Sequence, residues 1–265
     1  MGAKLWAVAD LHTAVPKNAE LVSTLKSENP HDWLIVAGDV AEEPSKVIAT
    51  LEQLKTHYAE VIWAPGNHEL FGHEQSQTVG KARYDYLLKQ CRRIGVHTPE
   101  SPYVQFAGHT IVPLFTLYDY TFRAPGSTVQ QALTAARTAK RVLLDDIAIA
   151  PYVDVQAWCW ERLTYSVRRL SSVHGPTILV NHWPLVAEPL QQLHIPEIAL
   201  WSGSIHTRRW PQRFQASQVI YGHLHTPGTL EIDGIAHHEV SLGYPYQWQD
   251  NLSQRNWPHL VVSDA

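Results

Sequence analysis

The 265-residue chain has little cysteine and no excess of positive charge, and both shortages exclude classes of protein. Its two cysteines, Cys91 and Cys159, lie far apart and make neither a disulfide framework nor a Cys-x-x-Cys zinc motif. We therefore expect a reduced, cytoplasmic setting. The net charge of −4 gives no electrostatic reason to expect nucleic acid or an anionic membrane as a partner.

Long apolar runs are also missing. No stretch approaches the roughly 18 apolar residues of a membrane span, and the apolar run after Lys4 is too short for a signal-peptide core. No membrane partner is therefore expected. Hydrophobic residues still make up 45% of the chain, enough to build the core of one large domain over residues 1–265.

Short apolar runs alternate with amphipathic stretches in the first third of the chain. The runs at 5–9, 33–37 and 61–64 are too short for helices and predict buried strands, whereas 17–27 and 44–57 have helical spacing. This alternation predicts parallel strands joined by right-handed crossovers. Further strands are predicted at 103–106, 110–114, 177–180, 218–221, 229–232 and 235–240, and further helices at 77–94, 129–149 and 154–172.

Two long segments break the strand pattern. Residues 118–174 are predicted to form a helical insertion that could cover a site as a lid. Residues 184–213 are rich in proline and tryptophan and predict a long loop with a short helix, whose tryptophans we expect to pack in the core rather than wall a pocket. The end of the chain, 263–265, is expected to be frayed.

Five short polar clusters follow five of the predicted strands. Strand ends at one edge of an α/β sheet are where ligands bind, so we expect these distant loops to meet at one sheet edge. An aspartate taken alone could be a helix N-cap, but five coincident clusters favour a common site. The clusters are Asp10-Leu11-His12, Gly38-Asp39, Gly66-Asn67-His68-Glu69, Asn181-His182 and Gly222-His223-Leu224-His225.

The residue types in these clusters suit a pair of metal ions. Two divalent ions can clamp the oxygens of a phosphoryl group. A carboxylate can bridge two ions, and neutral imidazole nitrogens complete the shells around them. The Asp-x-His and His-x-His spacings place two ligands on one side of an extended stretch.

The five clusters resemble the motifs of the calcineurin-like metallophosphoesterases, in the family's order and with none missing. The resemblance spans residues 10 to 225. It implies an α/β fold, an αβ-βα sandwich of two mixed β-sheets flanked by helices, and a site for two divalent or trivalent metal ions. Manganese, iron or zinc suits the mixed nitrogen and oxygen ligands best.

The resemblance also implies a role for each site residue. A hydroxide that bridges the two ions would attack phosphorus, His68 would be the general acid, and Glu69 could orient His68. Catalysis would rest on His68, Asn67 and Asp39. The implied ligands are Asp10, His12, Asp39 and His225 for the first ion, and Asp39, Asn67, His182 and His223 for the second.

The function expected from these features is metal-dependent hydrolysis of a phosphate ester. We favour a phosphomonoesterase acting on a small metabolite, such as a sugar phosphate or nucleotide, over a phosphodiesterase acting on cyclic or linear nucleotides. A non-catalytic metal-binding scaffold is a third possibility, disfavoured because His68 and every ligand position are intact. No basic stripe accompanies the clusters, which disfavours a nuclease.

Overall fold

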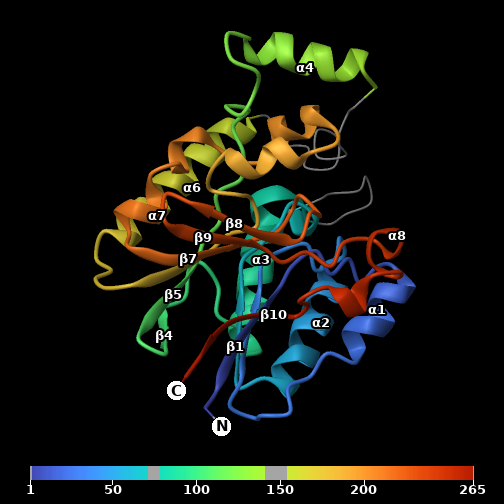
Figure 1. Cartoon of the computed structure of the whole chain (residues 1–265), viewed down its shortest axis with the longest axis vertical. Coiled ribbons are helices and arrows are strands. Elements are labelled where there is room, and N and C mark those ends of the chain that lie inside the picture. The colour runs from blue at the N-terminus through green and yellow to red at the C-terminus, as the bar shows by residue number, and fades with distance from the viewer. Residues whose placement is uncertain (1, 71–77, 141–153, 265) are drawn as a thin grey trace.

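The computed structural model describes residues 2–70, 78–140 and 154–264, and Figure 1 shows their arrangement. Two β-sheets carry the fold, one of four strands in the order β10-β1-β2-β3 and one of six in the order β4-β5-β6-β7-β9-β8. Helices α1 and α2 lie beside the first sheet, and α6 and α7 lie beside the second (Figure 1). The predicted sandwich of two mixed sheets flanked by helices is confirmed.

The four-stranded sheet contains the three strands predicted near the N-terminus, which pair in parallel. Its helices form for local reasons: Pro44 occupies the first turn of α2, and Val47, Leu51 and Leu54 are buried at helical spacing. The elements are β1 (Lys4–Val8), α1 (Pro16–Ser23), β2 (Trp33–Val36), α2 (Pro44–His57), β3 (Glu60–Trp63) and β10 (His259–Ser263).

Ser263 and Asp264 are not frayed, so the prediction of a frayed end was wrong for these two residues. Ser263 belongs to β10, which pairs antiparallel with β1, with Lys4 opposite Ser263. The Asp264 N–H also donates to the Ala3 carbonyl at 2.7 Å. Pairing with β1 places this short apolar run in the sheet. Residue 265 lies outside the described residues.

In the six-stranded sheet, β5, β6, β7 and β9 are parallel, and the edge strands β4 and β8 are antiparallel to their neighbours. The predicted hairpin at Asp233-Gly234 joins β8 to β9. The strands are β4 (Val104–Phe106), β5 (His109–Pro113), β6 (Thr177–Val180), β7 (Ala216–Tyr221), β8 (Gly228–Ile232) and β9 (Ile235–Glu239).

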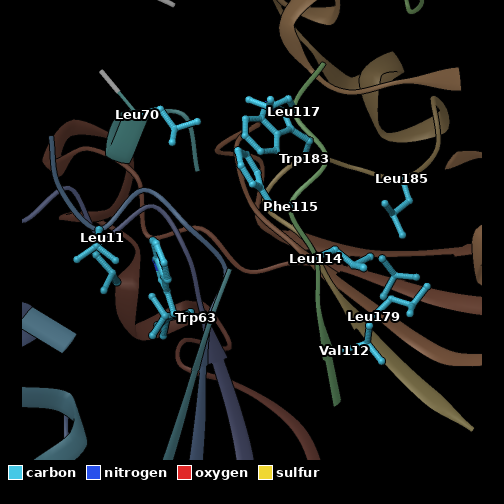
Figure 2. Close-up of a cluster of buried hydrophobic side chains, with 14 of the residues drawn as sticks. Leu11, Trp63, Leu70, Val112, Leu114, Phe115, Leu117, Leu179, Trp183 and Leu185 are labelled. Atoms are coloured by element: carbon cyan, nitrogen blue, oxygen red, sulfur yellow. The ribbon is translucent and has the colours of Figure 1, made fainter. Parts of the chain in front are cut away.

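The strands bury both faces because alternate side chains point to opposite sides. Ile35 of β2 and Ile178 of β6 lie in a core between the two sheets. Their neighbours Val36 and Leu179 face the helices instead. Figure 2 shows part of this helix-side core, with Trp63 beside the first sheet and a group including Phe115 and Trp183 beside the second.

The predicted helices at 77–94 and 129–149 are shorter where the structure describes them. The first begins at Gly80 because Val79 is extended, and the second begins at a capping box between Thr128 and Gln131. Residues 77 and 141–149 lie outside the described residues. The helices after β3 are η1 (His68–Leu70), α3 (Gly80–Arg93), α4 (Val129–Thr138) and α6 (Val155–Leu170).

Helix α6 belongs to the core of the sandwich. It buries Trp158, Cys159 and Leu163, and the Trp158 ring lies 5.2 Å from that of Phe115, just after β5. The prediction of a helix at 154–172 is thus confirmed, and this half of the predicted insertion packs against a sheet. By contrast, α4 stands at the edge of the molecule (Figure 1).

Residues 184–213 form a loop with short helical turns, as predicted. The tryptophans of this region, Trp183, Trp201 and Trp210, are buried, which confirms packing as their role. None of the helices that the structure describes is long and apolar enough to cross a membrane. The remaining short helices are η2 (Glu188–Gln192), η3 (Pro196–Trp201), η4 (Ile205–Thr207), α7 (Trp210–Arg213), α8 (Pro245–Trp248) and η5 (Leu252–Gln254).

If α6 is a core helix, its two tryptophans should differ sharply in their effect on stability. Trp158→Ala should lower the free energy of unfolding by about 3–5 kcal/mol, because it empties a packed site. Trp160 is 48% exposed, so Trp160→Ala should change stability by less than about 0.5 kcal/mol. Urea unfolding of both variants checks this, and equal effects would contradict the core placement of α6.

Candidate metal centre

The five polar clusters meet at one place in the folded chain. The expectation of a single sheet edge is wrong, because three clusters follow strands of the four-stranded sheet and two follow strands of the six-stranded sheet. The site lies where the ends of the two sheets come together. Three groups have ligand atoms within 4.8 Å of one another: Asp10, His12 and His225; His12, Asp39 and His68; and Asp10, Asp39 and His182.

The backbone is strained at most of the predicted ligands. Asp10, His12, Asp39, His223 and His225 all have positive φ, between 42° and 73°. This region is unfavourable for residues other than glycine, and such strain clusters at functional sites. This backbone conformation directs the side chains of the loops toward one point.

Two glycines let the loops approach the aspartates. A Cβ at Gly66 would overlap the Asp39 carboxylate, and a Cβ at Gly222 would overlap that of Asp10. No residue with a Cβ fits at Gly66 or Gly222 without displacing an aspartate.

The first set of side chains surrounds Asp10. His225 Nε2 lies 3.1 Å from Asp10 Oδ1 and 3.2 Å from His12 Nε2. His12 Nε2 lies 3.9 Å from the same carboxylate oxygen. These three atoms face one another, as ligands of one cation would.

The second set surrounds Asn67 and His182. His182 Nε2 lies 3.0 Å from Asn67 Oδ1 and 3.4 Å from Asp39 Oδ2. His223 Nδ1 lies 3.1 Å from Asn67 Oδ1 and 3.2 Å from His182 Nε2. The other nitrogen of His182, Nδ1, faces the Ala37 carbonyl at 2.9 Å, so it can donate there and leave Nε2 to the centre.

The electrostatics of the centre favour a cation. Burial opposes ionisation of Asp10, but the charge of His225 and its hydrogen bond hold the pKa of Asp10 below its usual range. Burial also opposes a charge on His182, yet the Asp39 carboxylate raises the pKa of His182 to about 10. A divalent ion would supply the same positive charge and release such protons.

The donor set fits two metal ions of the predicted kind. It combines buried carboxylates, one amide oxygen and four imidazoles, which suits manganese, iron or zinc. The buried His223 Nε2 atom has no hydrogen-bond partner among the described residues, while His223 Nδ1 faces the centre. All seven predicted ligands, together with His68, thus lie in one cluster.

His68 is oriented by a glutamate outside the five clusters. Its Nδ1 lies 3.1 Å from Glu42 Oε1, and its Nε2 lies 3.8 Å from Asp39 Oδ2. Glu69, which the sequence offered for this role, is fully buried and accepts backbone N–H groups of Asp39, Val40 and Gly66 instead. Glu69 therefore ties together the loops after β2 and β3, and the structure gives the orienting contact to Glu42.

Sequence reasoning also missed three residues after β9. Ser241 contacts Asp10, Tyr244 stacks on His12, and Gln247 contacts His225. Their sequence has no motif or spacing that marks them. They reach the site because β9 lies next to β7 in the sheet, which only the topology reveals.

A cleft of about 690 Å³ opens onto the centre, where Asp39, Asn67, His68, His223 and His225 line it. Its two walls come from the loop after β6 and from the segment after β9. No described residue of 118–174 lines it. The wall residues are Leu193, His194, Ile195 and Ile198 on one side, and Tyr244, Tyr246, Gln247 and Arg255 on the other, with Leu224 and Thr226 between.

Arg255 is the one lysine or arginine among these lining residues, and its guanidinium is directed at the backbone. It donates from Nη1 to the Leu242 carbonyl at 3.2 Å and from Nη2 to the Gln247 carbonyl. The cleft therefore combines ligand-rich, apolar and aromatic surfaces with little fixed positive charge.

Comparison with known proteins gives the family and the fold. A family model described as calcineurin-like phosphoesterase matches residues 3–227. An acyl-carrier-protein phosphodiesterase, PptH of Mycobacterium tuberculosis, is 41% identical over 271 residues, which cover 98% of this chain and 83% of that protein. The crystal structure of the phosphopantetheinyl hydrolase PptH from the same organism matches with a TM-score of 0.91 at 41% identity, over 94% of this chain and 92% of that one.

The two glutamates near His68 should contribute very different amounts to the stability of the metal-free protein. Glu69→Ala should lower the free energy of unfolding by about 3 kcal/mol or more, because each buried donor left unpaired costs about 1–3 kcal/mol. Glu42 is 37% exposed, so Glu42→Ala should change stability by less than about 1 kcal/mol. If chemical denaturation shows the reverse order, the structural role given to Glu69 is wrong.

Proposed function

This chain belongs to the calcineurin-like phosphoesterase family, and we propose that it hydrolyses the phosphodiester joining a phosphopantetheinyl group to a carrier protein. Metal-dependent hydrolysis of a phosphate ester follows from the family, and the clustered histidines and aspartates of this chain fit it. The sequence-based preference for a small phosphomonoester finds no support in the relative, which is named a phosphodiesterase. The diester alternative is therefore the one we develop.

The observation that carries this proposal is the lining of the cleft. A phosphomonoester carries about two negative charges at neutral pH, and proteins commonly hold such groups with bidentate arginine. Here the one lining guanidinium donates to backbone carbonyls. A diester carries a single charge, and apolar and aromatic walls suit an extended arm built of methylene, methyl and amide groups.

In the proposed centre, Asp39 would be a ligand of both ions. Asp10, His12 and His225 would complete the set for the first ion, and Asn67, His182 and His223 that for the second. When bound, the ions supply Lewis-acid polarisation of the phosphoryl oxygens and lower the pKa of water. Asn67 turns its Oδ1 toward His182 and His223, and its Nδ2 amide group can donate to a phosphoryl oxygen in the cleft.

His68 is proposed as the general acid. Cleavage leaves an alkoxide on a hydroxyl-bearing side chain of the carrier protein, and protonation of that oxygen completes the reaction. His68 lines the cleft and places Nδ1 against Glu42 at 3.1 Å. The carboxylate of Glu42 can stabilise the imidazolium and aim Nε2 into the cleft, as an orienting acid does in a catalytic triad.

The substrate assignment is tested with metal-stripped protein resupplied with Mn²⁺. A phosphopantetheinylated acyl carrier protein should lose the mass of its phosphopantetheinyl group, and bis-p-nitrophenyl phosphate should react faster than p-nitrophenyl phosphate. Mass spectrometry and absorbance follow the two reactions. If the carrier protein keeps its phosphopantetheinyl group while the monoester is hydrolysed rapidly, the proposal is rejected and the chain is a phosphomonoesterase.

Removal of the proposed acid should slow the reaction and leave metal binding unchanged. His68→Ala should lower kcat on the carrier-protein substrate on the order of 10²–10⁴-fold, because the leaving oxygen loses its proton donor. Elemental analysis should still find two ions in this variant. Glu42→Gln should lower kcat by less, since it removes only the charge that orients His68. Wild-type turnover in His68→Ala would show that His68 is not the acid.

A further inference from the structure

We propose that the segment from Ser241 to Gln247, which follows β9 and includes most of α8, positions the three ligands proposed for the first ion alone. This inference rests on the proposed metal centre. Each of those ligands, Asp10, His12 and His225, is contacted by one side chain of the segment. None of the clusters found in the sequence includes any part of it.

Gln247 fixes the ring of His225. Gln247 Oε1 lies 2.8 Å from the Tyr244 backbone N and 2.9 Å from His225 Nδ1. A backbone N–H can only donate, so the amide atom facing it is the oxygen. His225 Nδ1 must then carry the proton that it shares with this oxygen. As a neutral metal ligand, the ring would then offer Nε2, the atom that is directed at Asp10 and His12.

Tyr244 supports the ring of His12. The two rings stack with centroids 4.5 Å apart and planes 12° apart. His12 has a left-handed backbone, with φ of 42°, so its side-chain direction depends on packing around the ring. Tyr244 supplies this packing on one face, while His68 meets His12 edge-on, with centroids 4.7 Å apart.

Ser241 holds Asp10. Its Oγ lies 2.6 Å from Asp10 Oδ2, the oxygen that also accepts the His223 N–H at 2.9 Å. Oδ1 is thereby turned toward His225. The backbone of the segment follows the same loop, because the Leu242 N–H donates to Ala9 at 2.9 Å and the Gly243 N–H to Asp10 at 3.1 Å.

The segment is itself held firmly. Asn18 Nδ2 donates to the Gly243 carbonyl at 2.8 Å, and Trp248 Nε1 donates to Asn18 Oδ1 at 3.1 Å. Arg255 donates to the carbonyls of Leu242 and Gln247. These contacts give the three supporting side chains a fixed base.

The imidazoles proposed for the second ion are contacted from outside the segment, and only the His223 backbone N–H shares an acceptor, Asp10 Oδ2, with Ser241. His182 is held by the Ala37 carbonyl at the end of β2, and His223 faces Asn67 after β3. Damage to the segment should therefore weaken one ion and spare the other. A merely structural role would weaken both ions or only the fold.

The test is Gln247→Ala, with Gln247→Glu as the conservative variant and Gln249→Ala as a control in the same turn. Gln249 contacts Lys17 rather than a proposed ligand. Metal-stripped proteins are titrated with Mn²⁺ by calorimetry, and bound metal is counted after dialysis. His225→Ala and His182→Ala provide the signatures of losing the first and the second ion.

Gln247→Ala should lower affinity for one ion by about 10–100-fold, the usual effect of removing a partner behind a metal ligand, and its titration should resemble that of His225→Ala. Gln247→Glu keeps an acceptor oxygen and should restore binding, and Gln249→Ala should match wild type. A wild-type protein that binds fewer than two ions would reject the metal centre itself. Two ions in wild type with an unchanged titration for Gln247→Ala, or equal weakening of both ions, would reject only this inference.

Discussion

The rest of the site depends on two aspartates buried side by side. Asp10 is 0% exposed and Asp39 is 2% exposed, and isolated buried carboxylates cost much free energy unless they are paired and hydrogen-bonded. The protein meets this cost in part with donors: the backbone N–H of His223 for Asp10 and that of His68 for Asp39. The surrounding imidazoles and the proposed ions supply the positive charge.

This requirement explains features that otherwise look unrelated. Five ligands accept an unfavourable backbone so that their side chains converge. Glu69 is buried as an acceptor for three backbone groups, which fixes the loop that carries Asp39. The stability lost to strain and burial is offset by the large apolar core behind the loops, where alternate strand residues fill both faces of each sheet.

Much of this arrangement could be predicted from the sequence, because local signals mark it. Short apolar runs mark β1, β2 and β3, Pro44 and a helical stripe mark α2, and the polar clusters mark the ends of strands. Residues without local signals were missed. β10 is the edge strand that pairs with β1 from the other end of the chain, and Glu42 has no feature that distinguishes it from Glu43 before the chain folds.

The surroundings of the cleft also include features that the sequence does not reveal. Residues 118–174 look from their sequence like one helical insertion, yet α6 buries Trp158 against Phe115 and contributes nothing to the cleft. The walls come instead from loops after β6 and β9, whose positions follow from strand order rather than from composition. The cleft walls and the side chains behind Asp10, His12 and His225 thus come from topology, added to a cluster that the motifs predict.

The central claim is that two ions share Asp39, and anomalous X-ray diffraction from crystals grown with Mn²⁺ tests it most directly. We expect two manganese peaks, one on each side of the Asp39 carboxylate, with Asp10, His12 and His225 around one and Asn67, His182 and His223 around the other. A single peak, or a second peak away from Asp39, would contradict it.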